Sequence, residues 1–158
     1  MFNILTQPAG FTVTVSAWAS ENGHVEVVTL LLSDARVNPS AVNNQVIRNA
    51  SNEGHVEVVK LLLSDERADP SDENNQAIQE ASRNGHVEVV KLLLKDVRVD
   101  PNAVCSQSIR WASREGHTEV VKLLMSDARV DPTYNCLAMH AAIKNGHVEV
   151  ARLLQSNA

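Results

Sequence analysis

Apolar positions along the chain recur at a helical spacing. The short block VIRNA (residues 46–50) places two branched aliphatic residues and an alanine on one side of a helix. The block HVEVVKLLLSD (residues 55–65) is apolar around most of its circumference. Its polar stripe consists only of Glu57, Lys60 and Ser64. A helix of this kind needs apolar neighbours on several sides, so the pattern predicts packed helices.

The residues between these blocks predict where each helix begins and ends. Asn44 can act as an N-cap for the first helix. Gly54 permits the backbone reversal that ends it. Pro70 restricts both itself and Asp69 and therefore ends the second helix. The predicted unit is a helix, a tight turn, a second helix and an extended loop.

This unit is repeated along the chain. Gly-His pairs occur at Gly23-His24, Gly54-His55, Gly85-His86, Gly116-His117 and Gly146-His147, in steps of 31, 31, 31 and 30 residues. Pro39, Pro70, Pro101 and Pro132 follow the same period. A repeat of this length predicts a solenoid, in which each unit buries its apolar surface against its neighbours.

Composition limits the classes of function. Aromatic residues make up 3% of the chain, so the core must be aliphatic. A net charge of −5 argues against nucleic-acid binding, which usually requires a basic field. Two cysteines are too few for a disulfide scaffold, so we expect an intracellular, cytoplasmic protein. No segment has the roughly 20 apolar residues of a membrane span.

Candidate catalytic and metal-binding residues are explained better by the repeat. Five of the six histidines occupy one repeat position, and stacked helices lie about 8–10 Å apart, too far for neighbouring histidines to share a zinc ion. We expect each of these histidines to form a local hydrogen bond at the start of its helix. Cys105 and His117 could be drawn as a nucleophile and base, but no third group orients them. The sequence predicts no catalysis, cofactor or metal; an enzyme or metal protein built on the stack is the alternative.

A second repeated motif follows each apolar helix. It is an aspartate with an arginine two residues later: Asp34 and Arg36, Asp65 and Arg67, Asp96 and Arg98, Asp127 and Arg129. We expect these residues to form a network of surface ion pairs along one edge and to order the loops.

The pattern AS..GHVEVVKLLL resembles the central part of the ankyrin repeat, and Leu137–His140 keeps the histidine that this family has at the start of its first helix. The resemblance covers about residues 12–158 and implies an all-α, helix-turn-helix solenoid of five repeats. As one domain over residues 1–158, these would span about 12–42, 43–73, 74–104, 105–134 and 135–158, preceded by a capping segment at 1–11. The alternation FTVTV favours a strand locally, but the repeat alignment predicts a helix from about Thr14.

Two departures from the ankyrin pattern affect the loops. The period is 31 rather than 33 residues, and Asp-x-Arg replaces the usual glycine after the second helix, so we expect short or irregular hairpins. This form is similar to arrays common in giant DNA viruses and amoeboid protists. In the last unit, Ala151 and Gln155 replace apolar residues on one helical face, which indicates a terminal cap.

Positions that differ between units are the candidates for function. One series is Trp18, Asn49, Glu80, Trp111 and Ala141, and a second is Glu21, Asn52, Arg83, Arg114 and Lys144. The resemblance implies that these positions and the hairpin tips line the concave, partner-binding side. The tips would be Val42, Glu73, Val104 and Tyr134. The candidate partner-binding residues are Trp18, Asn49, Glu80, Arg83, Trp111, Arg114, Tyr134 and Lys144.

These residues become more basic and aromatic toward the carboxyl end. Trp, Tyr and Arg dominate binding energy at interfaces. The sequence therefore predicts a monomeric module that binds another protein, with an acidic segment of the partner on the basic side. The alternative is a structural or self-associating module, or part of a longer ankyrin array; packing of the tryptophans between units would also explain them without a partner.

Overall fold

The computed structural model describes the backbone of residues 9–156 and the side chains of residues 12–156. This range contains ten α helices, one short 3₁₀ helix and no strand. The elements are α1 (Ala9–Glu21), α2 (Val25–Leu32), α3 (Ala41–Glu53), α4 (Val56–Ser64), α5 (Asp72–Arg83), α6 (Val87–Lys95), α7 (Ala103–Glu115), α8 (Thr118–Ser126), η2 (Pro132–Tyr134), α9 (Asn135–Lys144) and α10 (Val148–Gln155). The prediction of an all-α helical solenoid is confirmed.

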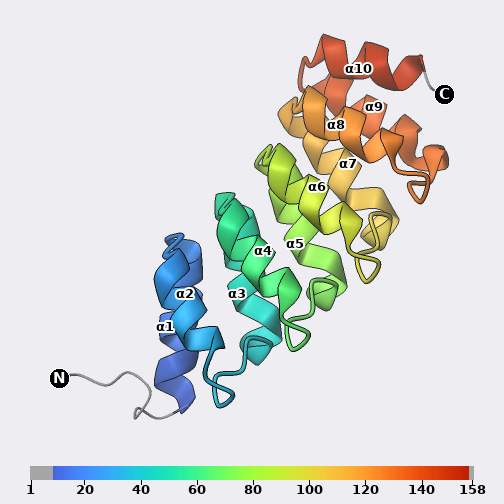
Figure 1. The fold of residues 1–158 in the computed structure, drawn as a ribbon. Coiled ribbons are helices and arrows are strands. Elements are labelled where there is room, and N and C mark those ends of the chain that lie inside the picture. Colours follow the sequence, from blue (N-terminus) through green and yellow to red (C-terminus); the bar gives the residue numbers. More distant parts are fainter. Residues whose placement is uncertain (1–8, 157–158) are drawn as a thin grey trace.

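The helices form two parallel rows. Each odd-numbered helix packs against the next odd-numbered helix and against the even-numbered helix that follows it in the chain. The even-numbered helices form the second row. Helices α1 and α10 lie at opposite ends of the stack (Figure 1). The molecule is therefore built from contacts between neighbours, as expected for a solenoid.

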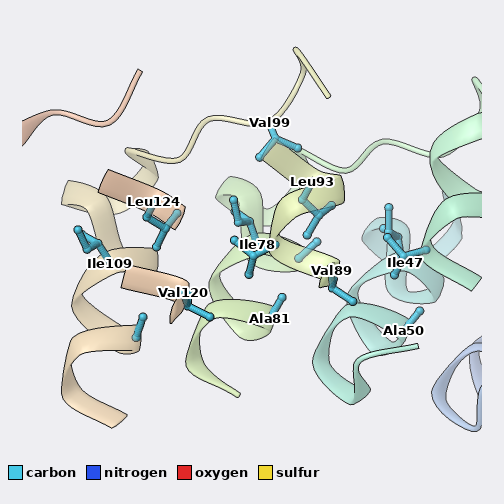
Figure 2. Packing of buried hydrophobic residues seen from close by; sticks show 14 of the residues in the cluster. Ile47, Ala50, Ile78, Ala81, Val89, Leu93, Val99, Ile109, Val120 and Leu124 are labelled. Atoms are coloured by element: carbon cyan, nitrogen blue, oxygen red, sulfur yellow. The ribbon is translucent and has the colours of Figure 1, made fainter. Parts of the chain in front are cut away.

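The core runs without interruption through the stack and is aliphatic, as predicted. Ile47, Ile78 and Ile109 occupy corresponding positions on α3, α5 and α7 and are at most 1% exposed. Alanines one turn later let the odd-numbered helices approach each other closely. Leu93 on α6 and Leu124 on α8 fill the space between the two rows (Figure 2). Burying an aliphatic side chain of this size stabilises the fold by about 1.5–3 kcal/mol.

The Gly-His pairs join neighbouring units. Gly54 has a φ of +79° and ends α3, as predicted. A Cβ atom on Gly54 would lie 2.5 Å from Nδ1 of His86 in the next unit. The Nε2 atom of His86 is 2.8 Å from the carbonyl oxygen of Asn52. The prediction that the histidines bond locally is therefore wrong, because the ring reaches back across the unit boundary and glycine provides the room for it.

The Asp-x-Arg motifs also connect units. Asp127 and Arg129 form the predicted ion pair, with 2.7 Å between carboxylate and guanidinium. Arg129 then donates hydrogen bonds to the carbonyl oxygens of Val99 and Leu94 in the preceding unit. The salt bridges of the four motifs are each confined to one motif. The connection along the edge is made by arginine-to-carbonyl hydrogen bonds, so the predicted ion-pair network is corrected in this respect.

The first turns of α3, α5 and α7 are unexpectedly left-handed. Val42, Asn43 and Asn44 have φ values of 52–57°, and residues 73–75 and 104–106 repeat this conformation. Asn44 is buried and does not cap α3 as predicted. Its Oδ1 atom instead accepts a hydrogen bond from the backbone N–H of Asp69. The side chain of Asn44 thus ties its turn to the next loop, and no β-hairpin forms within the described range.

The two ends of the stack differ from the expectations in detail. Helix α1 already begins at Ala9, earlier than the predicted start near Thr14. Residues 1–8 of the predicted capping segment lie outside the described residues. At the other end, Gln155 is exposed and Ala151 is half-buried, but Ile143 and Val148 are each 60% exposed. The final helix pair therefore presents a mixed apolar and polar surface.

Candidate protein-binding surface

The variable positions identified in the sequence lie on the row formed by α1, α3, α5, α7 and α9. We call the exposed side of this row the odd-helix face. It carries two hollows of similar size, of about 290 and 220 Å³. The acidic hollow is lined by Glu21, Gln45, Arg48, Asn49, Asn52, Glu53, Gln76 and Glu80. The basic hollow is lined by Gln107, Arg110, Trp111, Arg114 and Ala141.

The basic hollow is organised around Trp111 on α7. The guanidinium carbons of Arg83 and Arg114 each lie 4.8 Å from the centroid of a Trp111 ring. Arg83 comes from the end of α5, whereas Arg114 is one turn along α7. Cation–π contacts hold both arginines over the indole. Each arginine also has an acidic neighbour, Glu80 at 3.9 Å from Arg83 and Glu115 at 3.6 Å from Arg114.

The acidic hollow has the opposite charge. Three glutamates line it against one arginine, Arg48. The guanidinium of Arg48 is used inside the fold: it donates hydrogen bonds to the carbonyl oxygens of Asn43 and Val42 and to the side chain of Gln76. The Nδ2 atom of Asn49 is 3.4 Å from a carboxylate oxygen of Glu21. This hollow therefore offers mainly carboxylates and amides to a partner.

The structure brings some of the predicted residues together and leaves others apart. Arg83, Trp111 and Arg114 form one cluster, while Asn49 and Glu80 share the acidic hollow. The predicted residues Trp18, Tyr134 and Lys144 line neither hollow. Trp18 is 54% exposed, and its ring centroid is 4.9 Å from that of His24. Tyr134 is half-buried in η2, and Lys144 is exposed in the last turn of α9.

Sequence reasoning missed Arg110 and Gln107, which line the basic hollow. For Arg110 the signal was present one position before the tryptophan series. That position holds Ala17, Arg48, Gln79, Arg110 and His140 in successive units, and it varies as widely as the tryptophan series. Gln107 gave no such signal, because Gln45 and Gln76 occupy the same position in two other units.

Other candidate chemistry is not assembled in the described range. Among residues 12–156, no group of three or more His, Cys, Asp or Glu side chains could hold a metal ion. Cys105 and Cys136 are both exposed and unpaired. None of the helices between residues 9 and 156 is long and apolar enough to cross a lipid bilayer.

Comparison with known proteins agrees with the helix-pair architecture. A family model described as ankyrin repeats (3 copies) matches residues 16–105 and 106–158, which together make up most of the chain. No curated protein shows a significant match. The family match, the Gly-His pairs and the two rows of helices lead to one conclusion: this chain belongs to the ankyrin repeat family.

Proposed function

We propose that this protein is a binding module that recognises another protein on its odd-helix face, the concave side implied by the ankyrin resemblance. Ankyrin repeats generally act as protein-interaction modules. Within that role, we propose that the basic hollow binds an acidic segment of the partner. The observation that carries the proposal is the packing of Arg83 and Arg114 over Trp111.

The physical argument concerns preorganisation. A flexible arginine loses conformational entropy when it binds, and this loss weakens association. Here the indole ring already holds two guanidinium groups before a partner arrives. Tryptophan and arginine are also the residue types that contribute most binding energy at interfaces. The cluster therefore combines positive charge with a rigid apolar surface.

Catalysis is not part of this proposal, since ankyrin repeats are typically non-catalytic. The exposed, unpaired Cys105 and Cys136 support a reducing compartment such as the cytoplasm. The partner would then be another intracellular protein.

Affinity capture tests the proposal. The full chain and the double variant Trp111→Ala with Arg114→Glu serve as baits in a cell lysate, and bound proteins are identified by mass spectrometry. We expect at least one protein that the native chain captures and the variant loses. Circular dichroism first checks that the variant retains its helices.

A matched control separates a local effect from a general change in charge. The double variant Val97→Ala with Lys95→Glu makes one apolar truncation and one charge reversal away from the odd-helix face, at exposed positions. We expect this control to capture the same proteins as the native chain. Equal capture by all three baits would contradict the proposal.

A further inference from the structure

The basic hollow differs from the acidic hollow in a way that narrows the chemistry of the partner. Two arginines line the basic hollow, and no acidic side chain does. We infer that this hollow binds a phosphorylated side chain, so that the acidic segment of the partner is a phosphopeptide. This inference rests on the proposed function, because it specifies what occupies the same surface.

The lining residues are arranged as one stripe. Gln107, Arg110, Trp111 and Arg114 are spaced i, i+3, i+4 and i+7 on α7, so their side chains leave the helix on one side. Ala141 on α9 replaces the larger residues found in the other units. Its small side chain leaves the space beside Trp111 open. Donors from Gln107, Arg110 and Arg114 can therefore converge on one anion.

Arg110 is available to a ligand, whereas its counterpart Arg48 is not. All the described hydrogen bonds of the Arg48 guanidinium go to atoms of the fold itself. Arg110 is exposed, and within residues 12–156 its guanidinium makes no hydrogen bond or ion pair. The same residue type at the same repeat position thus stabilises the fold in one unit and faces an open hollow in the other.

Charge and geometry favour a phosphate over a carboxylate. A phosphate monoester carries about −1.5 to −2 charges at pH 7 and three acceptor oxygens, which matches two guanidinium groups and an amide. A single carboxylate would neutralise only one of the two arginines. Arg83 adds positive charge beside Trp111, while Glu80 near Arg83 and Glu115 near Arg114 offset part of the charge of these two arginines. Clusters of arginines are a recurring means of binding phosphorylated motifs.

Nuclear magnetic resonance of the full chain tests the inference directly. The two tryptophans give two indole N–H signals, assigned with Trp18→Phe. Phenyl phosphate is the dianionic probe at pH 7.5, and benzoate is the monoanionic probe of similar ring size. We expect phenyl phosphate to shift the Trp111 signal saturably and the Trp18 signal little, with benzoate binding at least about 10-fold more weakly.

Two variants make the site assignment specific. Arg110→Gln should weaken phenyl phosphate binding about 10-fold, whereas Arg152→Gln, at an exposed position on α10, should leave it unchanged. Equal binding of the two probes, equal shifts of both indole signals, or an unchanged affinity in Arg110→Gln would each overturn the inference.

The failure of this inference can be distinguished from failure of the proposed function. The lysate used for capture is divided, and one half is treated with a phosphatase that is then inhibited. Loss of the Trp111-dependent partner after this treatment supports a phosphopeptide. Retention of the partner overturns the phosphopeptide while leaving protein recognition on the odd-helix face intact.

Discussion

The two hollows of the odd-helix face occupy equivalent parts of the stack and have opposite chemistry. Between the second and fourth units, the residue before the buried alanine changes from Asn49 to Trp111, and the one three positions later changes from Asn52 to Arg114. The isoleucine and alanine that face the core are the same in both units. The core thus determines the shape of the face, and a few outward positions determine what it can bind.

The third and fourth units are also in direct contact at the point where the charge of the face changes. Arg83 places its guanidinium over Trp111 in the next unit. Its carbonyl oxygen lies 2.8 Å from Nε2 of His117, which starts the helix after Trp111. The same residue therefore contributes to the binding surface and to the inter-unit contact. A change at this junction should affect both.

The largest effect is expected from loosening that junction with Gly85→Ala. Gly85 has a φ of +76°, and a Cβ atom would lie 2.7 Å from Nδ1 of His117. The left-handed conformation costs about 1–2 kcal/mol for a non-glycine residue, and displacing the histidine loses a hydrogen bond of about 0.5–1.5 kcal/mol. We expect a loss of about 1.5–3.5 kcal/mol in the free energy of unfolding, measured by urea denaturation.

Gly146→Ala is the matched control for this prediction. Gly146 has nearly the same conformation, with a φ of +80°, but no atom lies within 4 Å of the added Cβ. Only the conformational cost of about 1–2 kcal/mol should remain. If the two substitutions destabilise the protein equally, the contact between Gly85 and His117 contributes nothing to stability.

The free energies of unfolding of Arg129→Ala and Arg36→Ala should differ by a smaller amount. Both arginines pair with an aspartate two residues earlier, but only Arg129 is seen to donate to carbonyl oxygens of a preceding unit. Charge-assisted hydrogen bonds of this kind are worth more than an exposed ion pair. We expect Arg129→Ala to lower the free energy of unfolding by about 1–2 kcal/mol.

Chemical denaturation of the two variants side by side checks this prediction. Arg36→Ala should unfold close to the native midpoint, because Arg36 is largely exposed. Equal midpoints for the two variants would mean that the cross-unit bonds of Arg129 add no stability.

Much of the fold could be predicted from the sequence because repeated residues have repeated physical causes. The Gly-His spacing and the nearly all-apolar second helices indicated helix pairs that stack, and the structure has them. The destination of the histidine and arginine side chains could not be predicted in the same way. His86 bonds to a carbonyl 34 residues earlier, in the preceding unit. Every unit of a periodic sequence offers the same residues, so the sequence alone does not say whether a side chain contacts its own unit or a neighbouring one.

The candidate site was predictable in part for a related reason. Variation between units revealed Arg83, Trp111 and Arg114, which the structure brings together. It did not reveal that Arg48 makes hydrogen bonds within the fold while the guanidinium of Arg110 makes none to the described residues, because both are arginines at one repeat position. That difference depends on the bonds that Arg48 makes to the loop before it.

The Asp-x-Arg ion pairs of the first and fourth units should make the free energy of unfolding depend on pH in acid. The hydrogen bond from Arg36 lowers the pKa of Asp34 to about 2, and that from Arg129 lowers the pKa of Asp127 below its ordinary value of 3.8. Since each pKa is lower in the folded state, the stabilisation is present above pH 3.8 and is lost as the pH falls toward the folded value. Asp127→Asn should therefore destabilise the protein at pH 7, with the difference from the native chain shrinking as the pH falls below 3.8.

Urea unfolding of both proteins between pH 7 and pH 2 measures this convergence, and a carboxyl-carbon titration of Asp34 by nuclear magnetic resonance reports its pKa directly. A gap between Asp127→Asn and the native chain that stays constant down to pH 2 would show that the ionised form of Asp127 does not contribute.

The smallest predicted effect is the coupling between neighbouring side chains at each hollow, measured without a partner. A double-mutant cycle with Arg83→Ala and Trp111→Ala measures their coupling free energy from unfolding data. An exposed cation–π contact is worth about 0.5–1 kcal/mol, so we expect a coupling in this range. A parallel cycle with Glu21→Ala and Asn49→Ala tests the long, 3.4 Å contact in the acidic hollow, for which we expect a coupling close to zero. If the first coupling is also close to zero, Arg83 is not held over Trp111 in solution. The arginine would then have to be ordered by the partner, and the basic hollow would not be preorganised at this position.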